Sequence, residues 1–274
     1  GFSFENIFGN ITALNLKFQS PSRLPHDINV LIGPNGFGKS RVLHQIVQDW
    51  ISPSEDNLPG FVEKPNLSQI VVVSYSPFER FPVDLAGKKL QDTDAYRYFG
   101  FRGRAAPSDG SKWGRIKLSH EFPKRNAAES LVSCLRDDKR YKSIRDWARK
   151  VATVERVLKT AIEFDFAAVE IASNRRARTF YSDISLIEPL SFDVEIQDGR
   201  HRYIPIASDR IEELNDEKLS EFLLSESGVT FFLHGSPIQL SSGQRLFAYI
   251  VINILGAIRR NSLILVDEPE LFLH

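Results

Sequence analysis

The sequence predicts an α/β protein with an antiparallel β lobe at the N-terminus, a parallel core sheet and a helical insertion. Three observations support this prediction. An apolar run at residues 28–32 leads into a glycine-rich loop and then into a helical pattern. Two further apolar runs, 69–75 and 263–266, are typical of buried parallel strands. The middle of the chain differs from both ends in its charge and periodicity.

The chain divides into three parts. Residues 1–83 begin with loosely alternating apolar positions, as in antiparallel strands, and continue through the glycine-rich loop to the run at 69–75. Residues 84–183 form a basic, partly helical insertion. Residues 184–274 return to the strand pattern and carry the last two motifs. In this third part we expect a helix at 209–224 and strands at 184–187, 192–196, 201–206 and 229–233.

The insertion carries most of the charge asymmetry. Between residues 87 and 150 there are 17 Lys or Arg and 8 Asp or Glu, whereas the whole chain is neutral. Such a basic segment favours one anionic partner surface. Asn126 and Glu129 have capping-box spacing, which predicts a helix from there to about Asp138. A second helix is expected over 143–164, and a strand over 95–102.

Composition limits the class of protein. The 274 residues are 42% hydrophobic, which is enough for a substantial core. No apolar run reaches the roughly 18 residues of a membrane span, and no secretory signal opens the chain, so we expect a cytoplasmic protein with no membrane partner. The single cysteine, Cys134, is expected in the core rather than as a nucleophile. The absence of methionine indicates a processed, trimmed or partial chain.

The glycine-rich loop has the form G-x-x-x-x-G-K-S, which wraps a phosphate with backbone N–H groups at a helix N-terminus. Lys39 is predicted to reach the β and γ phosphates, and the Ser40 hydroxyl to ligate Mg²⁺. The predicted cofactors are therefore ATP and Mg²⁺. The nucleotide-binding residues assigned on this basis are Gly33, Pro34, Asn35, Gly36, Phe37, Gly38, Lys39, Ser40 and Arg41.

Two adjacent carboxylates follow the apolar run at 263–266. Asp267 is predicted to be the second Mg²⁺ ligand, and Glu268 the catalytic group that positions and deprotonates water. An apolar strand that ends in Asp-Glu has no easy structural explanation, because burying an unpaired carboxylate is costly. Glu270 fits a supporting role and plain surface charge equally well.

A third motif, Leu240-Ser-Ser-Gly-Gln244, precedes a helical pattern that runs to Ile258. Read alone it is a helix cap. With the two motifs above, it resembles the signature of ABC-type ATPases, with Ser242 where the commoner form has glycine. The finer resemblance is to the SMC, RecF and OLD branch, including ATPases of bacterial defence and DNA-maintenance systems. That resemblance rests on the strand and loop at 28–36, on Ser74–Phe81 and on Asp267–His274.

The resemblance implies a P-loop NTPase fold of ABC type and a head-to-tail homodimer that closes around ATP. In that family, the signature of one subunit binds the γ-phosphate held by the other, and the residues at these positions are Ser241, Ser242, Gly243 and Gln244. No glutamine follows the run at 69–75 where the family has one. The family continues beyond Asp267–His274 with a D-loop, further strands and a switch histidine, so we expect this chain to lack the C-terminal part of the domain.

The expected partner is DNA or RNA, or an effector protein that processes it, such as a nuclease, in defence or repair. The six histidines lie in unrelated contexts without metal-ligand spacing, so a nuclease activity would belong to another chain or region. A candidate nucleic-acid surface is the stripe on the expected second helix formed by Arg145, Arg149, Arg156 and Lys159, alongside Arg97, Arg102, Arg104, Lys112 and Arg115 with the aromatics Tyr98, Phe99 and Trp113. A solvated helix face explains that stripe as well.

Two other functions remain open. A nucleotide-gated scaffold or sensor subunit would close on ATP but turn over slowly. A transporter ATPase subunit is disfavoured, because 200 residues separate Ser40 from Leu240.

Overall fold

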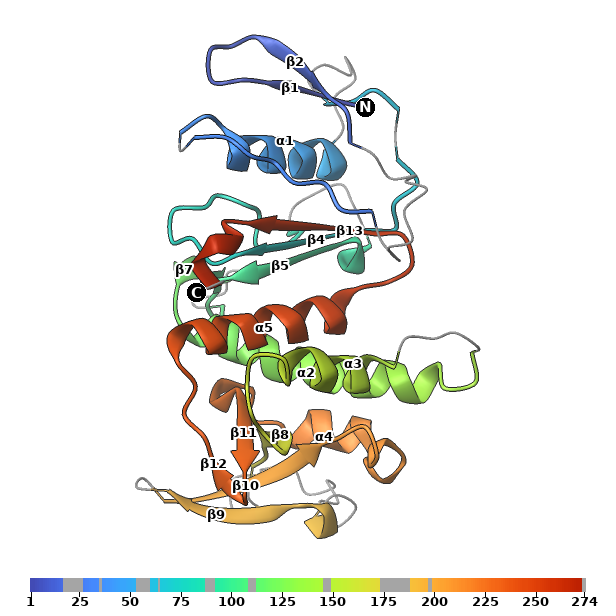
Figure 1. The fold of residues 1–274 in the computed structure, drawn as a ribbon, viewed down its shortest axis with the longest axis vertical. Coiled ribbons are helices and arrows are strands. Elements are labelled where there is room, and N and C mark those ends of the chain that lie inside the picture. Colours follow the sequence, from blue (N-terminus) through green and yellow to red (C-terminus); the bar gives the residue numbers. More distant parts are fainter. Residues whose placement is uncertain are drawn as a thin grey trace.

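The computed structural model stacks its elements in layers along the long axis (Figure 1). A small β-sheet, one helix, a parallel sheet, a layer of helices and a second, antiparallel sheet follow one another. This mixed α/β architecture agrees with the fold class predicted from the sequence. The structure describes residues 1–16, 27–34, 36–52, 60–63, 65–86, 92–107, 112–144, 149–172, 188–196 and 199–272.

The parallel sheet has the strand order β13 (Ser262–Asp267), β4 (Gln69–Ser74) and β5 (Tyr96–Gly100). Every residue of β4 is buried, because both faces of this central strand are covered. Ile70 and Val72 join the core cluster that contains α1 (Lys39–Ile51), whereas the alternate residues Val71 and Val73 join the cluster on the other face. The predicted parallel sheet is therefore confirmed, and it includes β5, which lies in the segment 84–183 that the sequence predicted to be an insertion.

The N-terminal lobe is antiparallel, as predicted. Its strands β1 (Phe2–Glu5), β2 (Ile11–Leu14) and β3 (Gly60–Phe61) have the order β2-β1-β3. Phe2 of β1 packs edge-on against Phe61 of β3, with 5.0 Å between the ring centroids. The α1 helix covers this small sheet on one side and the parallel sheet on the other (Figure 1).

The strand expected at residues 28–32 is not formed, and this prediction was wrong. Residues 27–34 have no regular secondary structure. Ile28, Val30 and Ile32 are 72%, 72% and 92% exposed. Among the described strands, β13 pairs with β4 alone, so residues 28–32 make no ladder with it. An apolar run without ladder partners cannot satisfy its backbone as a strand.

Three helices separate the two large sheets. They are α2 (Glu121–Arg140), α3 (Lys150–Leu158) and α5 (Ser242–Ala257). The α2 and α5 helices approach closely, because a Cβ atom built on Gly256 would lie 2.5 Å from the Ser130 carbonyl oxygen. Their apolar residues, with those of α3, form the largest core cluster, and Cys134 is buried within it.

The first central helix begins five residues earlier than predicted, at Glu121 rather than Asn126. Pro123 lies in its first turn, where a residue without an N–H group is tolerated because that N–H would have no helical acceptor. Phe122 and Pro123 are buried, so tertiary packing rather than the capping-box spacing fixes the start. The Asn126–Glu129 pair therefore lies within the helix and does not cap it.

The second central helix is shorter than the predicted 143–164 and spans Lys150–Leu158. Its start is set by Asp138 of α2, whose carboxylate accepts hydrogen bonds from the Lys150 and Val151 amides at 2.7 and 2.9 Å. This carboxylate supplies the acceptors that a capping side chain within the same helix would otherwise provide. Sequence spacing carries no signal for a cap donated by another helix.

The second large sheet is antiparallel throughout and has the strand order β12-β11-β8-β10-β9. The predicted strands at 192–196, 201–206 and 229–233 correspond to β9, β10 and β11, while the one at 184–187 lies outside the described residues. The bounds of the five strands are β8 Phe166–Glu170, β9 Phe192–Ile196, β10 Gly199–Ile206, β11 Val229–Leu233 and β12 Ser236–Pro237.

The helix expected at 209–224 divides into η4 (Ile211–Glu213) and α4 (Asp216–Phe222). Asn215 separates them, because its side chain accepts the Lys218 amide at 3.0 Å and caps α4. The strand expected at 95–102 ends at Gly100 and is followed by a two-stranded ribbon of β6 (Arg102–Arg104) and β7 (Ile116–Leu118). Four short 3-10 helices complete the described elements: η1 Thr93–Ala95, η3 Glu188–Leu190, η5 Ser225–Ser227 and η6 Pro269–Phe272. None of the described helices has the length and apolarity needed to cross a membrane.

Candidate functional site

The predicted site residues Ser40 and Asp267, far apart in sequence, meet at the carboxyl edge of the parallel sheet. Asp267 is the last residue of β13, Ser74 is the last residue of β4, and Ser40 lies in the first turn of α1. The Ser40 hydroxyl donates to Asp267 Oδ1 at 2.8 Å. The Ser74 hydroxyl donates to Asp267 Oδ2 at 3.5 Å. The carboxylate is thus held by two hydroxyl groups, one from the glycine-rich loop helix and one from the neighbouring strand.

Asp267 is buried, with 5% of its surface exposed, and the described residues form no ion pair with it. Burial raises the pKa of this carboxyl, and the nearby Glu270 raises it further, while hydrogen bonds from Ser40 and Ser74 act against the rise. A buried carboxylate without a cationic partner is costly in a folded protein. A bound cation at this position would remove that cost.

The donor set suits a magnesium ion that is shared with a substrate. Mg²⁺ prefers oxygen ligands and often takes only one or two from the protein, with water and phosphate completing its shell. Asp267 and Ser40 are two such oxygen donors. No group of three or more His, Cys, Asp or Glu side chains that could hold a metal occurs in the described part of the chain. The geometry therefore fits a metal brought with a phosphate better than a metal caged by protein alone.

The glycine-rich loop has a backbone conformation suited to binding a phosphate. Gly36 and Gly38 have φ of +82° and +89°, in the left-handed region that favours glycine. Gly38 is the N-cap of α1, and no side chain caps this end of the helix. No acidic residue lies in the first turn. The amides of this turn are thus available to an anion, and the helix dipole favours one there.

Lys39 folds back onto its own loop. Its Nζ donates to the Gly33 carbonyl at 2.8 Å and to the Pro34 carbonyl at 3.2 Å. Neutral carbonyl acceptors are weaker partners for an ammonium group than a phosphate is. Phe37 is exposed, and Asn35 lies outside the described residues.

The hairpin β1–β2 contacts the start of α1, which the sequence patterns do not indicate. Arg41 forms an ion pair with Glu5 at 3.0 Å. The Gln45 side chain exchanges two 2.9 Å hydrogen bonds with the backbone of Glu5. A Cβ atom on Gly38 would lie 3.2 Å from a methyl group of Ile7. Ile7 therefore lies beside the loop, and both Ile7 and its neighbour Phe8 are exposed.

Glu268 follows Asp267 with an unusual backbone. Its φ of +51° is in the left-handed region, which is uncommon for a residue with a side chain. Such conformations gather at functional sites, where the surrounding structure maintains them. Glu268 is half-buried, and Glu270 is exposed in η6. The left-handed backbone of Glu268 is therefore compatible with the catalytic role predicted for it. No side chain among the described residues forms a hydrogen bond with the Glu268 carboxylate.

The stretch Leu240–Gln244 caps α5 within its own subunit. Ser241 accepts the Gln244 amide at 3.2 Å, and Gln244 Oε1 accepts the Ser241 amide at 3.1 Å, which completes a capping box. Ser241 and Ser242 are exposed. The start of α5, the carboxyl end of β13 and the start of α1 lie along the same side of the molecule, in different layers (Figure 1). No hydrogen bond or ion pair among the described residues joins this stretch to Ser40 or Asp267.

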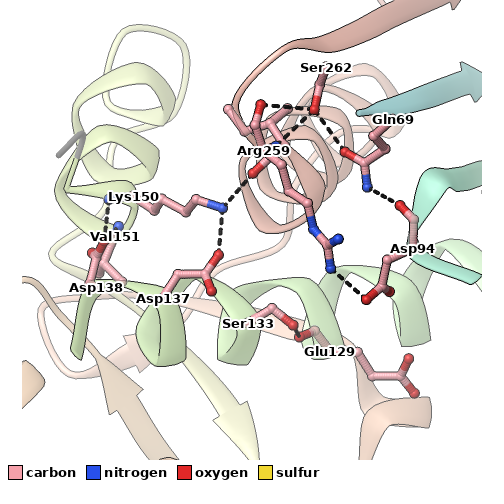
Figure 2. A network of polar contacts seen from close by, with 11 residues as sticks. Gln69, Asp94, Glu129, Ser133, Asp137, Asp138, Lys150, Val151, Arg259 and Ser262 are labelled. Atoms are coloured by element: carbon pink, nitrogen blue, oxygen red, sulfur yellow. Dashed lines mark hydrogen bonds and ion pairs between the residues drawn. The ribbon is translucent and has the colours of Figure 1, made fainter. Parts of the chain in front are cut away.

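The opposite end of β13 is held by a polar network (Figure 2). Arg259 donates to the Asp94 carboxylate at 2.5 Å, and Ser262 donates to the Gln69 side chain at 2.9 Å. Lys150, only 3% exposed, donates to Asp137 at 2.7 Å and to the Ile258 carbonyl at 3.0 Å. The turn between α5 and β13 is thereby tied to α2, α3 and the start of β5. This fixes the helix that carries the Leu240–Gln244 stretch relative to the strand that carries Asp267.

The basic stripe expected on the second helix is not present as a continuous face. Arg145 lies outside the described residues, and Arg149 is an N-cap residue with an extended backbone. Only Arg156 lies within α3, and Lys159 packs with its Nζ 5.4 Å from the centre of the Phe164 ring. The helical spacing that placed these four residues together therefore does not extend over them.

The other residues proposed for that surface form one group that is ion-paired or buried and a second group that is exposed. Arg97, Arg102 and Arg104 form ion pairs with Asp94, Glu79 and Asp84, respectively. Tyr98 and Phe99 are buried. Lys112, Trp113 and Arg115 are exposed.

The comparisons with known proteins give one distant relative. The chain is 23% identical over 257 residues to protein ea59 of Escherichia phage lambda. The match covers 90% of this chain but only 40% of ea59, so the chain spans less than half the length of that relative. No protein-family model matches the sequence, and no solved structure matches it either.

Proposed function

We propose that this protein binds ATP with Mg²⁺ and hydrolyses it, as a P-loop NTPase of ABC type. The observation that carries the proposal is the meeting of Ser40 and Asp267, whose oxygen atoms lie 2.8 Å apart at an uncapped, glycine-preceded helix start. A phosphate at the α1 N-terminus would receive backbone N–H groups from the loop. The same phosphate would lie beside the two oxygen donors suited to magnesium.

Binding requires a change of partner for Lys39. Its ammonium group now donates to the carbonyls of Gly33 and Pro34. In the ATP complex these bonds are exchanged for a charge-assisted bond to the β and γ phosphates, which is stronger. Phe8, exposed and next in sequence to Ile7, is the proposed stacking partner of the adenine ring, because aromatic side chains stack bases.

Hydrolysis needs a group that aligns a water molecule with the γ-phosphate. Glu268 adjoins Asp267, the proposed magnesium ligand, and has a left-handed backbone conformation. In the proposed reaction, the water oxygen bonds to the γ-phosphorus while the bond to the β–γ bridging oxygen breaks. The water proton goes to Glu268, and the products are ADP and phosphate. Magnesium supplies charge neutralisation on the phosphate oxygens.

The active assembly is proposed to be a head-to-tail homodimer with two ATP molecules between the subunits. The exposed start of α5 at Ser241–Gln244 is a second helix N-terminus, and such a terminus binds anions. It lies on the same side of the molecule as the glycine-rich loop, so two copies related by a twofold axis can place one on the phosphate held by the other (Figure 1). The proposed partners of this dimer are DNA or RNA, or an effector that processes nucleic acid.

Replacing Glu268 with Gln tests turnover and assembly together. The change keeps the shape of the side chain and removes the proton acceptor, so hydrolysis is expected to fall by about 10²-fold or more. ATP binding is expected to persist, and the trapped nucleotide to hold the dimer together in light scattering. The test uses the longest available form of the protein, with Glu217→Gln on the exposed surface of α4 as a matched control that is expected to keep its activity.

Three outcomes separate the candidate functions. Loss of turnover with a stable dimer supports the ATPase. Undiminished ATP hydrolysis in Glu268→Gln contradicts the assigned catalytic role. A parent protein that dimerises on ATP without measurable hydrolysis is instead a nucleotide-gated scaffold.

A further inference from the structure

The two-stranded ribbon of β6 and β7 leaves the core at the functional edge of the parallel sheet. It follows β5 directly, and β5 ends at the same carboxyl edge as Asp267 (Figure 1). In the described part of the chain, β6 and β7 pair only with each other, with Arg102 opposite Leu118 and Arg104 opposite Ile116. All three residues of β7 are exposed. Among the described residues, the ribbon therefore has no further strand partner, and its exposed strand β7 lies toward the sheet edge that carries Asp267.

The cationic side chains of β6 have carboxylate partners, whereas those of residues 112–118 do not form ion pairs with the described carboxylates. On β6, Arg102 pairs with Glu79, whose side chain is 1% exposed, and Arg104 pairs with Asp84. These pairs attach the ribbon to the core. Residues 112–118 carry three further cations and no acidic residue. Lys112, Arg115 and Lys117 are exposed, and none forms an ion pair with a described carboxylate.

An aromatic ring lies among these cations. The side chain of Trp113 is 50% exposed, with Lys112 Nζ 5.3 Å and Arg104 Cζ 5.9 Å from its ring centre. Gly114 fixes the backbone on which Trp113 and Arg115 stand, because a Cβ atom there would lie 1.8 Å from the Ala105 carbonyl oxygen. The Gly114 carbonyl also accepts Arg104 Nη1 at 3.0 Å. The ring and its flanking cations are thus held in place by the ribbon.

We propose that residues 112–118 bind single-stranded nucleic acid, with phosphates on Lys112, Arg115 and Lys117 and a base against Trp113. Cations that follow a backbone and an aromatic ring on which a base stacks are the two elements of single-strand binding. A base can reach a half-exposed ring only when it is unstacked, which favours a single strand over a duplex. The proposal rests on the nucleic-acid partner of the proposed function, but it does not require ATP hydrolysis.

The test is fluorescence anisotropy with a labelled oligo-dT of about 15 nucleotides, measured without ATP over a range of salt. Replacing Lys112, Arg115 and Lys117 with Gln is expected to flatten the log-affinity against log-salt slope by about 2 units. The matched control replaces Arg149, Arg156 and Lys159 with Gln. It removes the same charge from the other candidate surface and is expected to leave the slope unchanged.

The stacking contact has its own variant. Trp113→Ala is expected to lower affinity by about tenfold while leaving the salt slope unchanged, and Trp113→Phe to retain most of the binding. Equal thermal unfolding of the variants and the parent shows that the ribbon is intact.

Four outcomes overturn the proposal: an unchanged slope in the ribbon variant, an equal change in the control variant, no binding by the parent at low salt, or equally effective competition by poly-glutamate. The last outcome would assign the surface to acidic protein segments. ATP binding measured in parallel separates the two proposals. A parent that binds ATP but not the oligonucleotide contradicts only the ribbon, whereas one that binds the oligonucleotide but not ATP contradicts only the nucleotide site.

Discussion

The two ends of strand β13 differ in how they stabilise charge. Two ion pairs lie at its start, one between Lys150 and Asp137 and one between Arg259 and Asp94 (Figure 2). The Ser262 hydroxyl also donates a hydrogen bond to the Gln69 side chain. At its end, the buried Asp267 accepts hydrogen bonds from two hydroxyl groups and from the Glu268 backbone, and it has no cationic partner among the described residues. A charge network that is complete within the protein needs nothing further. We propose that the buried Asp267 carboxylate, which has no cationic partner among the described residues, receives a cation from outside.

The pKa values of the two aspartates follow this difference. Partial burial opposes ionisation of Asp94, but hydrogen bonds and charge from Arg259 and Arg97 outweigh it and lower its pKa. Burial raises the pKa of Asp267, and the hydroxyl groups offset only part of that rise. One end of the strand thus favours the charged carboxylate, and the other end disfavours it.

The largest expected effect on stability belongs to the complete network. Replacing Lys150 with Met keeps the buried aliphatic stem but leaves Asp137 and the Ile258 carbonyl without their donor. We expect the free energy of unfolding to fall by about 3 kcal/mol, as when one member of a buried pair is removed. Urea denaturation measures the change. ATP affinity is expected to stay within twofold of the parent, and a loss of binding in folded protein would show that the two ends are coupled.

At the glycine-rich loop beside Asp267, we expect a small effect on stability and a large effect on ATP affinity. Lys39→Ala removes contacts to two carbonyls of an exposed loop, so stability is expected to change by less than about 0.5 kcal/mol. The same change removes a charge-assisted phosphate contact of about 1.5–3 kcal/mol, which is about tenfold or more in ATP affinity. Calorimetric titration with Mg²⁺ and ATP checks this. Lys159→Ala is a control of equal charge, and equal affinity in Lys39→Ala and parent would contradict the nucleotide site.

The sequence predicted the contacts at the carboxyl edge of the parallel sheet better than the ion-pair network at its other edge. The glycine-rich loop and the Asp-Glu strand end have fixed spacing and local chemistry, so the proximity of Ser40 and Asp267 followed from motif positions alone. The network depends on side chains from five distant segments, and the cap that Asp138 gives to α3 comes from another helix. The periodicity of apolar residues in the sequence does not indicate contacts between side chains of distant segments.

The errors at residues 28–32 and 143–164 have a related cause. In the first segment an apolar run predicted a strand, but the strand needs a ladder partner that the described sheet does not give it. In the second, apolar spacing predicted one long helix, whereas the tertiary cap at Lys150 and the turn into β8 shorten it. Contact between Ser74 and Asp267 was also missed, because a serine at a strand end carries no distinctive pattern.

The smallest expected effect is also the sharpest test of the comparison, because the two ends should respond to pH with opposite sign. The folded-state pKa of Asp94 is lowered, so its charge stabilises the fold above pH 3.8 and this contribution is lost as pH falls through the folded value. The folded-state pKa of Asp267 is raised, so ionisation destabilises the fold as pH rises through that value, and the penalty is absent below pH 3.8.

At neutral pH, Asp94→Asn should therefore lower stability, and Asp267→Asn should raise it. Each difference is expected to be about 1 kcal/mol or less, and to shrink toward zero near pH 3. Thermal unfolding of both variants between pH 3 and 7 measures the two trends, and adding Mg²⁺ with ADP should stabilise the parent but not Asp267→Asn. If both variants lose stability equally at neutral pH, Asp267 is a structural carboxylate like Asp94, and the distinction between the two ends of β13 does not hold.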